Sequence, residues 1–333
     1  MTIQPGNFVR WYSVPLMTSK PFLNKLIKHC FYFWLILCFP LIGISQLTFT
    51  ESDQGIEIKE AGNKVLFYQK AIKTADGGFP RNNYIHPLYN LNGTELTEDF
   101  PGDHPHHRGV FWAWHQIIVG TLPLGDAWEC RDFIWNINKT DVSSKGQTLK
   151  LFISTQWESP LWLTKEGTKK PFLLENTTIS IHAKEHNYRI INFEISLLAL
   201  EEDLSIGGSD DEKGYGGFSV RMKLPKSVQF SSFNGIVSPK INAVKGGNWM
   251  NITSSSNGMK NASGIVIISH QGSPGSKQSW ILRKKESMQN CLYPGRKPVP
   301  VSTTDPTILK YSLLIYEGFM TGQEIQSIYE KLK

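Results

Sequence analysis

Four of the nine histidines fall in one short stretch, residues 99–115, with the sequence DFPGDHPHHRGVFWAWH. Imidazoles can take or give a proton near neutral pH, because their ordinary pKa is about 6.5. A guanidinium can bind a carboxylate or stabilise an oxyanion, and indole rings can stack on a ligand. No other window concentrates so many groups of this kind, and we expect the functional site here.

We assign a role to each candidate side chain. His106 and His107 are the acid/base candidates, and Glu129, from a second polar and aromatic cluster, is the complementary carboxylate. The side chains expected to bind substrate are His104, Arg108, Trp112, Trp114, His115, Tyr215 and Arg221. Two alternatives stay open: the histidines and arginine could hydrogen-bond a structural loop, and the tryptophans could pack in the core.

A metal site is a further alternative. It needs three or four nitrogen or oxygen ligands that converge, and Asp103, His104 and His106 are the candidates. Their spacing matches no strong zinc signature such as HExxH. A divalent metal is therefore left open as a cofactor and is not assigned.

The local geometry limits how many histidines can meet. Pro101 and Pro105 exclude a helix, whereas residues 110–119 are mostly β-branched or aromatic and predict one strand. Alternation then places Trp112 and Trp114 on one face and His115 on the other. In a straight extended chain His107 and His115 would lie roughly 26 Å apart, so we expect at most two or three imidazoles to share a site.

The N-terminal segment resembles a secretory signal. Lys20, Lys25 and Lys28 precede an apolar run over residues 30–44, which is shorter than the roughly 20 residues of a spanning helix. We place cleavage after Ser45 and leave open whether translation starts at Met1 or Met17. The mature chain, 46–333, is expected to be periplasmic or secreted, with no membrane span.

Charge and cysteine content narrow the partners. The formal charge is +6, but residues 1–45 carry four basic residues and no acidic ones, which leaves +2 for the mature chain. That balance gives no electrostatic case for nucleic acid, and the polar groups of residues 99–115 favour a small polar ligand as the partner. Cys130 and Cys291 remain after cleavage; pairing and separate thiols are both open.

Turn signals and short strands dominate the remaining sequence. Residues 149–157, 173–183 and 188–200 predict long antiparallel strands, and many shorter ones flank them. The one convincing helix begins after Thr321, which can cap it, with Glu324 three residues further on. We therefore predict an all-β fold: a single large antiparallel β-sandwich over residues 46–333, with a short C-terminal helix.

Five motifs carry a resemblance to a known family. They are His86–Tyr89, Asp99–Pro101, Asp103–Gly109, Tyr215–Gly217 and Asn290–Gly295. With them the chain resembles the PmoA family of secreted bacterial proteins, largely a domain of unknown function, over roughly residues 50–330. The label methane oxygenase does not transfer, because that enzyme's subunit is a multi-helix membrane protein.

The resemblance implies a fold like the galactose-mutarotase supersandwich, which several sugar-processing enzymes share, and the signal is similar to those of Bacteroidetes. The function expected from it is an exported carbohydrate-active enzyme of epimerase, lyase or hydrolase type that uses histidine acid/base chemistry. The alternatives are a non-catalytic carbohydrate-binding protein and a metal-dependent oxidoreductase. Fold alone does not choose among them.

Overall fold

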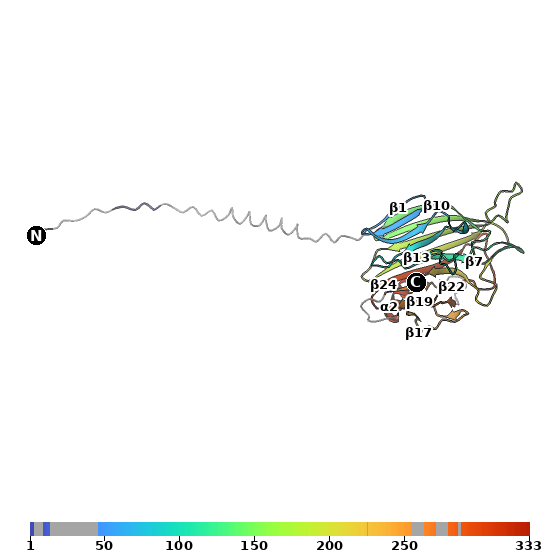
Figure 1. The fold of residues 1–333 in the computed structure, drawn as a ribbon. Coiled ribbons are helices and arrows are strands. Elements are labelled where there is room, and N and C mark those ends of the chain that lie inside the picture. Colours follow the sequence, from blue (N-terminus) through green and yellow to red (C-terminus); the bar gives the residue numbers. More distant parts are fainter. Residues whose placement is uncertain (3–8, 14–45, 225, 255–262, 271–278, 286–287) are drawn as a thin grey trace. The chain divides into compact units, whose positions relative to one another are not determined.

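A computed structural model describes residues 1–2, 9–13, 46–224, 226–254, 263–270, 279–285 and 288–333. Ser45–Lys333 form one unit, whose strands and C-terminal helix are drawn in Figure 1. The predicted signal peptide falls mostly on residues 14–45, outside the described residues, and stays a prediction. In the described part of the chain no helix is both long and apolar enough to cross a membrane.

Among the described residues the two largest sheets are antiparallel and have nine strands each. The first contains, in spatial order, β1 (Leu47–Glu51), β2 (Gly55–Glu60), β3 (Asn63–Gln69), β6 (Tyr84–Leu88), β7 (Val110–Trp114), β15 (Gly216–Arg221), β22 (Met288–Leu292), β21 (Ser279–Ile281) and β18 (Val244–Lys245). The second contains β10 (Ile134–Lys145), β11 (Thr148–Glu158), β12 (Leu173–His182), β13 (Tyr188–Ala199), β24 (Thr307–Glu317), β20 (Ser263–Ser269), β19 (Trp249–Ser254), β16 (Val228–Ser232) and β17 (Gly235–Ile236).

Smaller elements complete the unit. A four-stranded sheet contains β23 (Val299–Pro300), β14 (Leu204–Gly207), β8 (Gln116–Val119) and β9 (Leu122–Gly125), and a two-stranded ribbon contains β4 (Lys73–Ala75) and β5 (Gly78–Arg81). Helix α2 (Gly322–Leu332) packs Ile325 and Tyr329 against Trp249 of the second sheet. Thr321 and Glu324 form the predicted capping box, in which each side chain bonds the other residue's backbone N–H.

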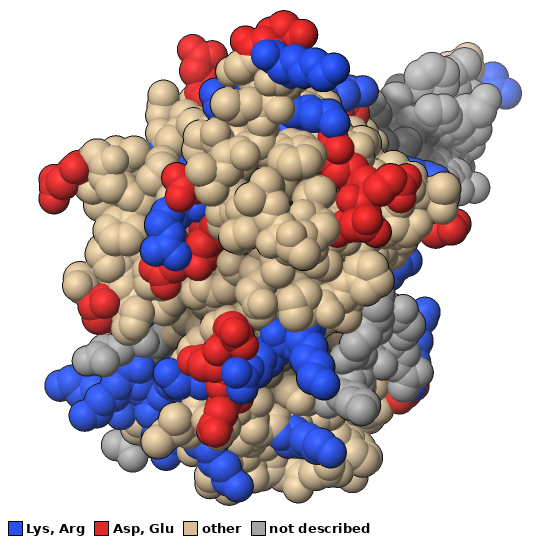
Figure 2. Space-filling view, turned by 90° about the vertical axis from the view of Figure 1, so that its right-hand side faces the viewer, with Lys and Arg blue, Asp and Glu red and all other residues tan. Residues whose placement is uncertain are grey.

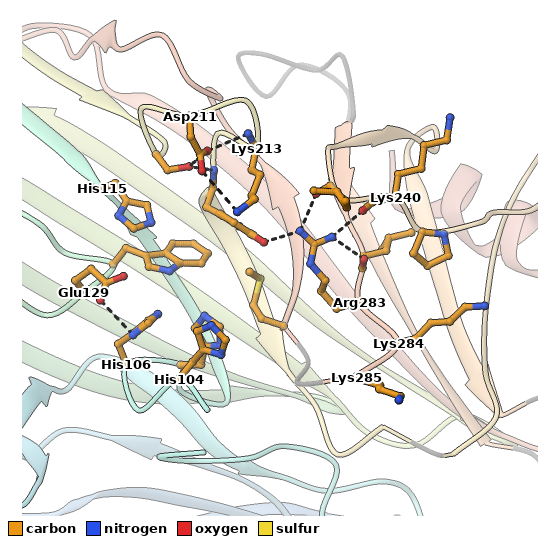
Figure 3. Close-up of a pocket in the computed structure, with 18 residues that line it drawn as sticks. His104, His106, His115, Glu129, Asp211, Lys213, Lys240, Arg283, Lys284 and Lys285 are labelled. Carbon is orange, nitrogen blue, oxygen red and sulfur yellow. Dashed lines mark hydrogen bonds and ion pairs between the residues drawn. The ribbon is translucent and has the colours of Figure 1, made fainter. Parts of the chain in front are cut away.

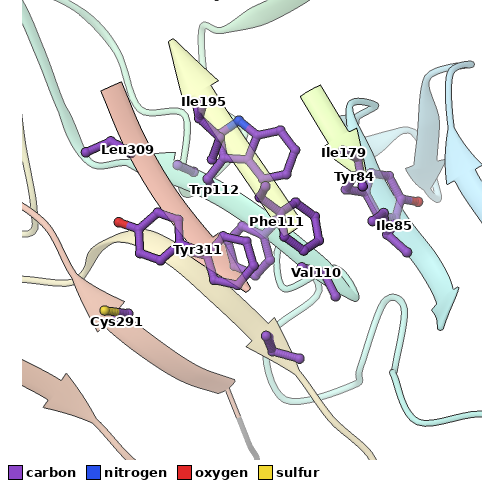
Figure 4. Close-up of a cluster of buried hydrophobic side chains, with 14 of the residues drawn as sticks. Tyr84, Ile85, Val110, Phe111, Trp112, Ile179, Ile195, Cys291, Leu309 and Tyr311 are labelled. Carbon is purple, nitrogen blue, oxygen red and sulfur yellow. The ribbon is translucent and has the colours of Figure 1, made fainter. Parts of the chain in front are cut away.

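The two large sheets face each other across an aromatic core (Figure 4). Trp112 of β7 contacts Phe193 of β13 with ring centroids 6.3 Å apart, and Phe218 of β15 stacks on Tyr311 of β24 at 4.6 Å. Along β12 buried and half-buried residues alternate strictly, so one face of this strand lies in the core. The predicted all-β sandwich with one short C-terminal helix is confirmed.

The prediction of a single strand over residues 110–119 is wrong. β7 pairs with β15 in the first sheet, whereas β8 pairs with β14 in the small sheet, and His115 lies where the chain passes from one to the other. The expected alternation holds within β7, because Trp112 and Trp114 face the second sheet and Phe111 faces the opposite way, towards Trp128. Cys130 and Cys291 are separate buried thiols.

Gly109 joins the histidine loop to β7 at a point where no side chain fits. Its φ is +27°, and a Cβ built there would lie 1.9 Å from the carbonyl oxygen of Ile85. Only glycine can therefore let the chain enter β7 this close to β6. The position of the preceding loop depends on this contact.

We expect Gly109→Ala to lower the free energy of unfolding by about 2–3 kcal/mol, because the backbones of β6 and β7 would have to separate. Chemical denaturation measures this change. Gly102→Ala is the matched control in the same loop, since a Cβ added there would meet nothing within 4 Å and its φ is not left-handed. Equal stabilities for the two variants would contradict the close-approach argument.

Candidate functional site

A cleft of about 850 Å³ opens on the side of the first sheet that faces away from the second (Figure 3). All four histidines of the 99–115 stretch line it, together with Trp128, Glu129 and Tyr215. The opposite wall is formed by residues 239–241 and 282–285. The expectation that at most two or three histidines could converge is wrong, because the chain is not extended here.

A tight turn brings three of the histidines together. The backbone N–H of His104 donates to Pro101 and that of His107 donates back to His104, which closes the turn. The rings of His104 and His107 stack with centroids 4.7 Å apart, and His106 meets His107 edge-on at 4.5 Å. The fourth histidine, His115, reaches the same cleft from the end of β7.

Arg221 of β15 anchors this turn. Its guanidinium donates to both carboxylate oxygens of Asp103, at 2.7 and 2.9 Å, and to Glu98 at 2.8 Å. It also lies 3.3 Å from Nδ1 of His107. Burial alone would raise the pKa of Asp103, but hydrogen bonds from Arg221 and His104 hold it well below its ordinary value. Arg221 is buried and positions the loop, a role other than its expected contact with substrate.

Arg108 fixes the other end of the same loop, and its expected place in the cleft is corrected. The side chain is fully buried, donates to Asp99 at 3.1 Å and to the carbonyl oxygen of Phe79, and lies over the ring of Phe100. Its partners are groups of the loop and its surroundings. Arg108 therefore hydrogen-bonds a structural loop, which was the alternative to substrate binding.

Trp112 and Trp114, the two tryptophans expected to bind substrate, also lie outside the cleft. Trp112 donates to Glu175 in the second sheet at 2.8 Å, and Trp114 donates to the carbonyl oxygen of Tyr293 at 2.9 Å. Both are buried in the core. Trp128 is the tryptophan that lines the cleft, between His115 at 5.3 Å and Tyr215 at 5.7 Å, centroid to centroid.

His106 and His107 are neutral over the physiological range. Burial lowers the pKa of His106 to about 3, and the charge of buried Arg81 adds to the shift. Burial and the neighbouring imidazoles lower the pKa of His107 to about 2. Since Arg221 can only donate, Nδ1 of His107 accepts and its proton sits on Nε2.

His115 and Asp126 form a different kind of pair. Nδ1 of His115 lies 2.9 Å from Oδ2 of Asp126, while Oδ1 of Asp126 accepts the backbone N–H of Glu129 at 2.9 Å. A carboxylate in this position fixes the tautomer and the orientation of the imidazole. Nε2 of His115 is then the nitrogen left for a ligand. No spacing rule in the sequence identifies Asp126 as this partner.

Glu129 sits on a short turn. A backbone bridge between Asp126 and Arg131 closes the turn, and the side chain of Glu129 approaches Nδ1 of His106 at 3.3 Å. Burial and the charge of Asp126 raise its pKa. A carboxyl group with a raised pKa is suited to hold a proton that it can give away.

Arg81 lies behind His106 and the Glu129 turn, and the sequence did not point to it. It is buried between the rings of Phe111 and Trp135 and donates to the carbonyl oxygen of Ala127 in the Glu129 turn. Its surroundings are aromatic rings, carbonyl groups and the thiol of Cys130. Nothing in the local sequence marks an arginine at the end of a two-stranded ribbon as part of a site.

The predicted metal ligands do not form a converging set. Asp103 is held by Arg221 and by His104 at 2.7 Å, and His106 faces Glu129. Among the described residues no three or more His, Cys, Asp or Glu side chains are arranged to hold one ion.

The sequence from residue 55 to residue 330 matches a family of unknown function, DUF6807, and the chain belongs to that family. No curated protein matches it. A crystallised protein from Salmonella typhimurium, provisionally assigned as a mutarotase, is similar at 9% sequence identity, over 86% of this chain and 99% of that one, with a TM-score of 0.34. The sandwich architecture is established by the strand pairing described above and not by this likeness.

We expect Arg221→Lys to lower the free energy of unfolding by about 2–3 kcal/mol, because an ammonium cannot reproduce the forked contacts to Asp103. Chemical denaturation measures the loss. Arg296→Lys is the control, since the Arg296–Asp210 pair is exposed and should tolerate the change without a measurable effect. A similar loss in both variants would contradict the anchoring role.

The lowered pKa of His107 predicts a stability that rises with pH. Between about pH 2 and 6.5 the unfolded chain binds a proton at this residue and the folded chain does not, so stability falls as the pH falls through that window. His106 acts in the same direction. Asp103 contributes to the pH dependence of stability only below pH 3.8, the ordinary pKa of its carboxyl group.

His107→Asn should therefore flatten the dependence of unfolding free energy on pH between 4 and 6, by roughly 1 kcal/mol per pH unit. Urea unfolding across that range measures the slope. The control is His186→Asn, at an exposed histidine in a turn. An unchanged slope in His107→Asn would contradict the buried neutral imidazole.

Proposed function

We propose that this protein is an exported carbohydrate-active enzyme that carries out proton transfer on a sugar held in the histidine cleft. The observation that carries the proposal is the His115–Asp126 pair, 2.9 Å apart, in a cleft of about 850 Å³ that also holds Glu129. An imidazole oriented by a carboxylate is a general base, and a carboxyl group with a raised pKa is a general acid. Together they provide both halves of an acid/base reaction.

The roles of the histidines differ from those expected from sequence. His106 and His107 bind protons too weakly to act as general bases near neutral pH, so in this proposal they bind and orient the sugar. His107 offers Nε2–H as a donor to a hydroxyl. His115 accepts a proton from the sugar at Nε2 while Glu129 gives one to a sugar oxygen, and the return transfers restore both groups.

This exchange moves protons and changes no oxidation state, which fits epimerisation, elimination or hydrolysis. The proposal of export rests on the predicted signal peptide. We also propose that the protein is related to the PmoA proteins and to galactose mutarotases. Carbohydrate binding without turnover is the second candidate. It is favoured by the Trp128–Tyr215 pair, which gives the cleft an aromatic side.

The test is product analysis on a panel of oligosaccharides with wild type, His115→Gln and Asp126→Asn. We expect both variants to lose about 10²–10⁴-fold in turnover, the usual contribution of general acid/base catalysis, while their melting temperatures change little. His186→Asn, remote from the cleft in sequence and exposed, serves as the control. Saccharide binding with no product from the wild type would support the binding protein and overturn the enzyme.

A further inference from the structure

The wall of the cleft that faces the histidines is basic. Lys240, Arg283, Lys284 and Lys285 line it, and they come from two separate segments of the chain; in Figure 3 the side chains of Lys240 and Lys284 extend away from the histidines. Among the described residues no carboxylate pairs with any of these four side chains. The nearby Lys213 differs, since it lies 3.8 Å from Asp211.

Arg283 builds this wall. Its guanidinium donates to the carbonyl oxygens of Lys240 at 2.9 Å and Ile241 at 2.8 Å, and to the hydroxyl of Tyr215 at 2.6 Å. All of these acceptors are neutral. The arginine therefore joins the two segments of the wall to the aromatic side of the cleft, and no carboxylate among the described residues pairs with it.

The acidic groups of the cleft lie elsewhere and are already engaged. Glu129 faces His106, and Asp211 accepts hydrogen bonds from Ser209, Lys213 and Gly214. On the face of the molecule shown in Figure 2, Lys and Arg side chains gather mainly in the lower half, beside a smaller acidic group. Unbalanced charge of one sign along a cleft raises the local concentration of ligands of the opposite sign.

We propose that the cleft takes an anionic oligosaccharide, with the reacting sugar against the histidines and carboxylate or sulfate groups against the wall of Lys240, Arg283, Lys284 and Lys285. This inference rests on the proposed function and adds the substrate class. The volume of about 850 Å³ is near the upper end of small-ligand sites and leaves room for more than one sugar ring. The mature chain is close to neutral overall, so the basic character belongs to the cleft and not to the protein as a whole.

The experiment measures binding by calorimetry at neutral pH. The probes are an oligogalacturonate, a sulfated galactan oligosaccharide, a neutral gluco-oligosaccharide of equal length, and a poly-glutamate peptide of equal charge. Each is tested against wild type, Lys284→Gln/Lys285→Gln, and the control pair Lys165→Gln/Lys169→Gln. The control removes the same charge from exposed lysines that do not line the cleft.

We expect the wild type to bind one of the two anionic saccharides at least tenfold more tightly than the neutral one. The Lys284/Lys285 variant should bind it roughly three- to tenfold more weakly, the range for two exposed ion pairs, and the control pair should bind as the wild type does. The uronate and sulfate probes decide which anionic group is recognised. Added salt should weaken wild-type binding.

Three results overturn the proposal. If neutral and anionic saccharides bind equally and the Lys284/Lys285 change has no effect, the anionic substrate class is refuted. The proposed sugar function would remain intact. Poly-glutamate that binds as tightly as the saccharides would show a surface that attracts any polyanion. If no saccharide binds at all, both the substrate class and the proposed function fail.

Discussion

The forked contact between Arg221 and Asp103 is the constraint on which the site depends. Arg221 belongs to β15, inside the first sheet, whereas Asp103 lies in a loop with little regular structure. Because the guanidinium is buried and its geometry is rigid, the ion pair fixes the position of the loop relative to the sheet. The turn of His104–His107, their ring contacts and the tautomer of His107 all follow from this anchor.

Positive charge is placed beneath the histidines at a cost to stability. Arg81 and Arg221 are both buried close to imidazoles, and their charges help to keep His106 and His107 unprotonated. Arg81 is surrounded by aromatic rings and neutral acceptors, an arrangement that is expensive for a buried cation. A core that served only stability would place an apolar side chain there. The arrangement is understandable if neutral imidazoles are needed at the cleft.

Sequence patterns predicted the sandwich and its elements well, because strand alternation and capping are local signals. β12 and β13 begin and end within a residue or two of the expected positions, and helix α2 begins directly after Thr321, as expected. The site was predicted only in outline. Which imidazoles converge depends on the change of sheet at His115 and on the Arg221 anchor, which lies more than a hundred residues further along the chain. Composition alone could not separate Trp128 in the cleft from Trp112 in the core.

The two walls of the cleft are linked through their charges. Burial is the main cause that keeps His106 and His107 neutral, and the charges of Arg81 and Arg221 add to it. A bound anion would leave this burial in place and would offset only the charge contribution, so it would raise the pKa of His106 and His107 only in part. By linkage, protons and an anionic ligand would then favour each other's binding. A cleft divided in this way keeps His106 and His107 as neutral hydrogen-bonding groups beside the His115–Asp126 pair, and it places the charge that would attract an anionic ligand on the opposite wall.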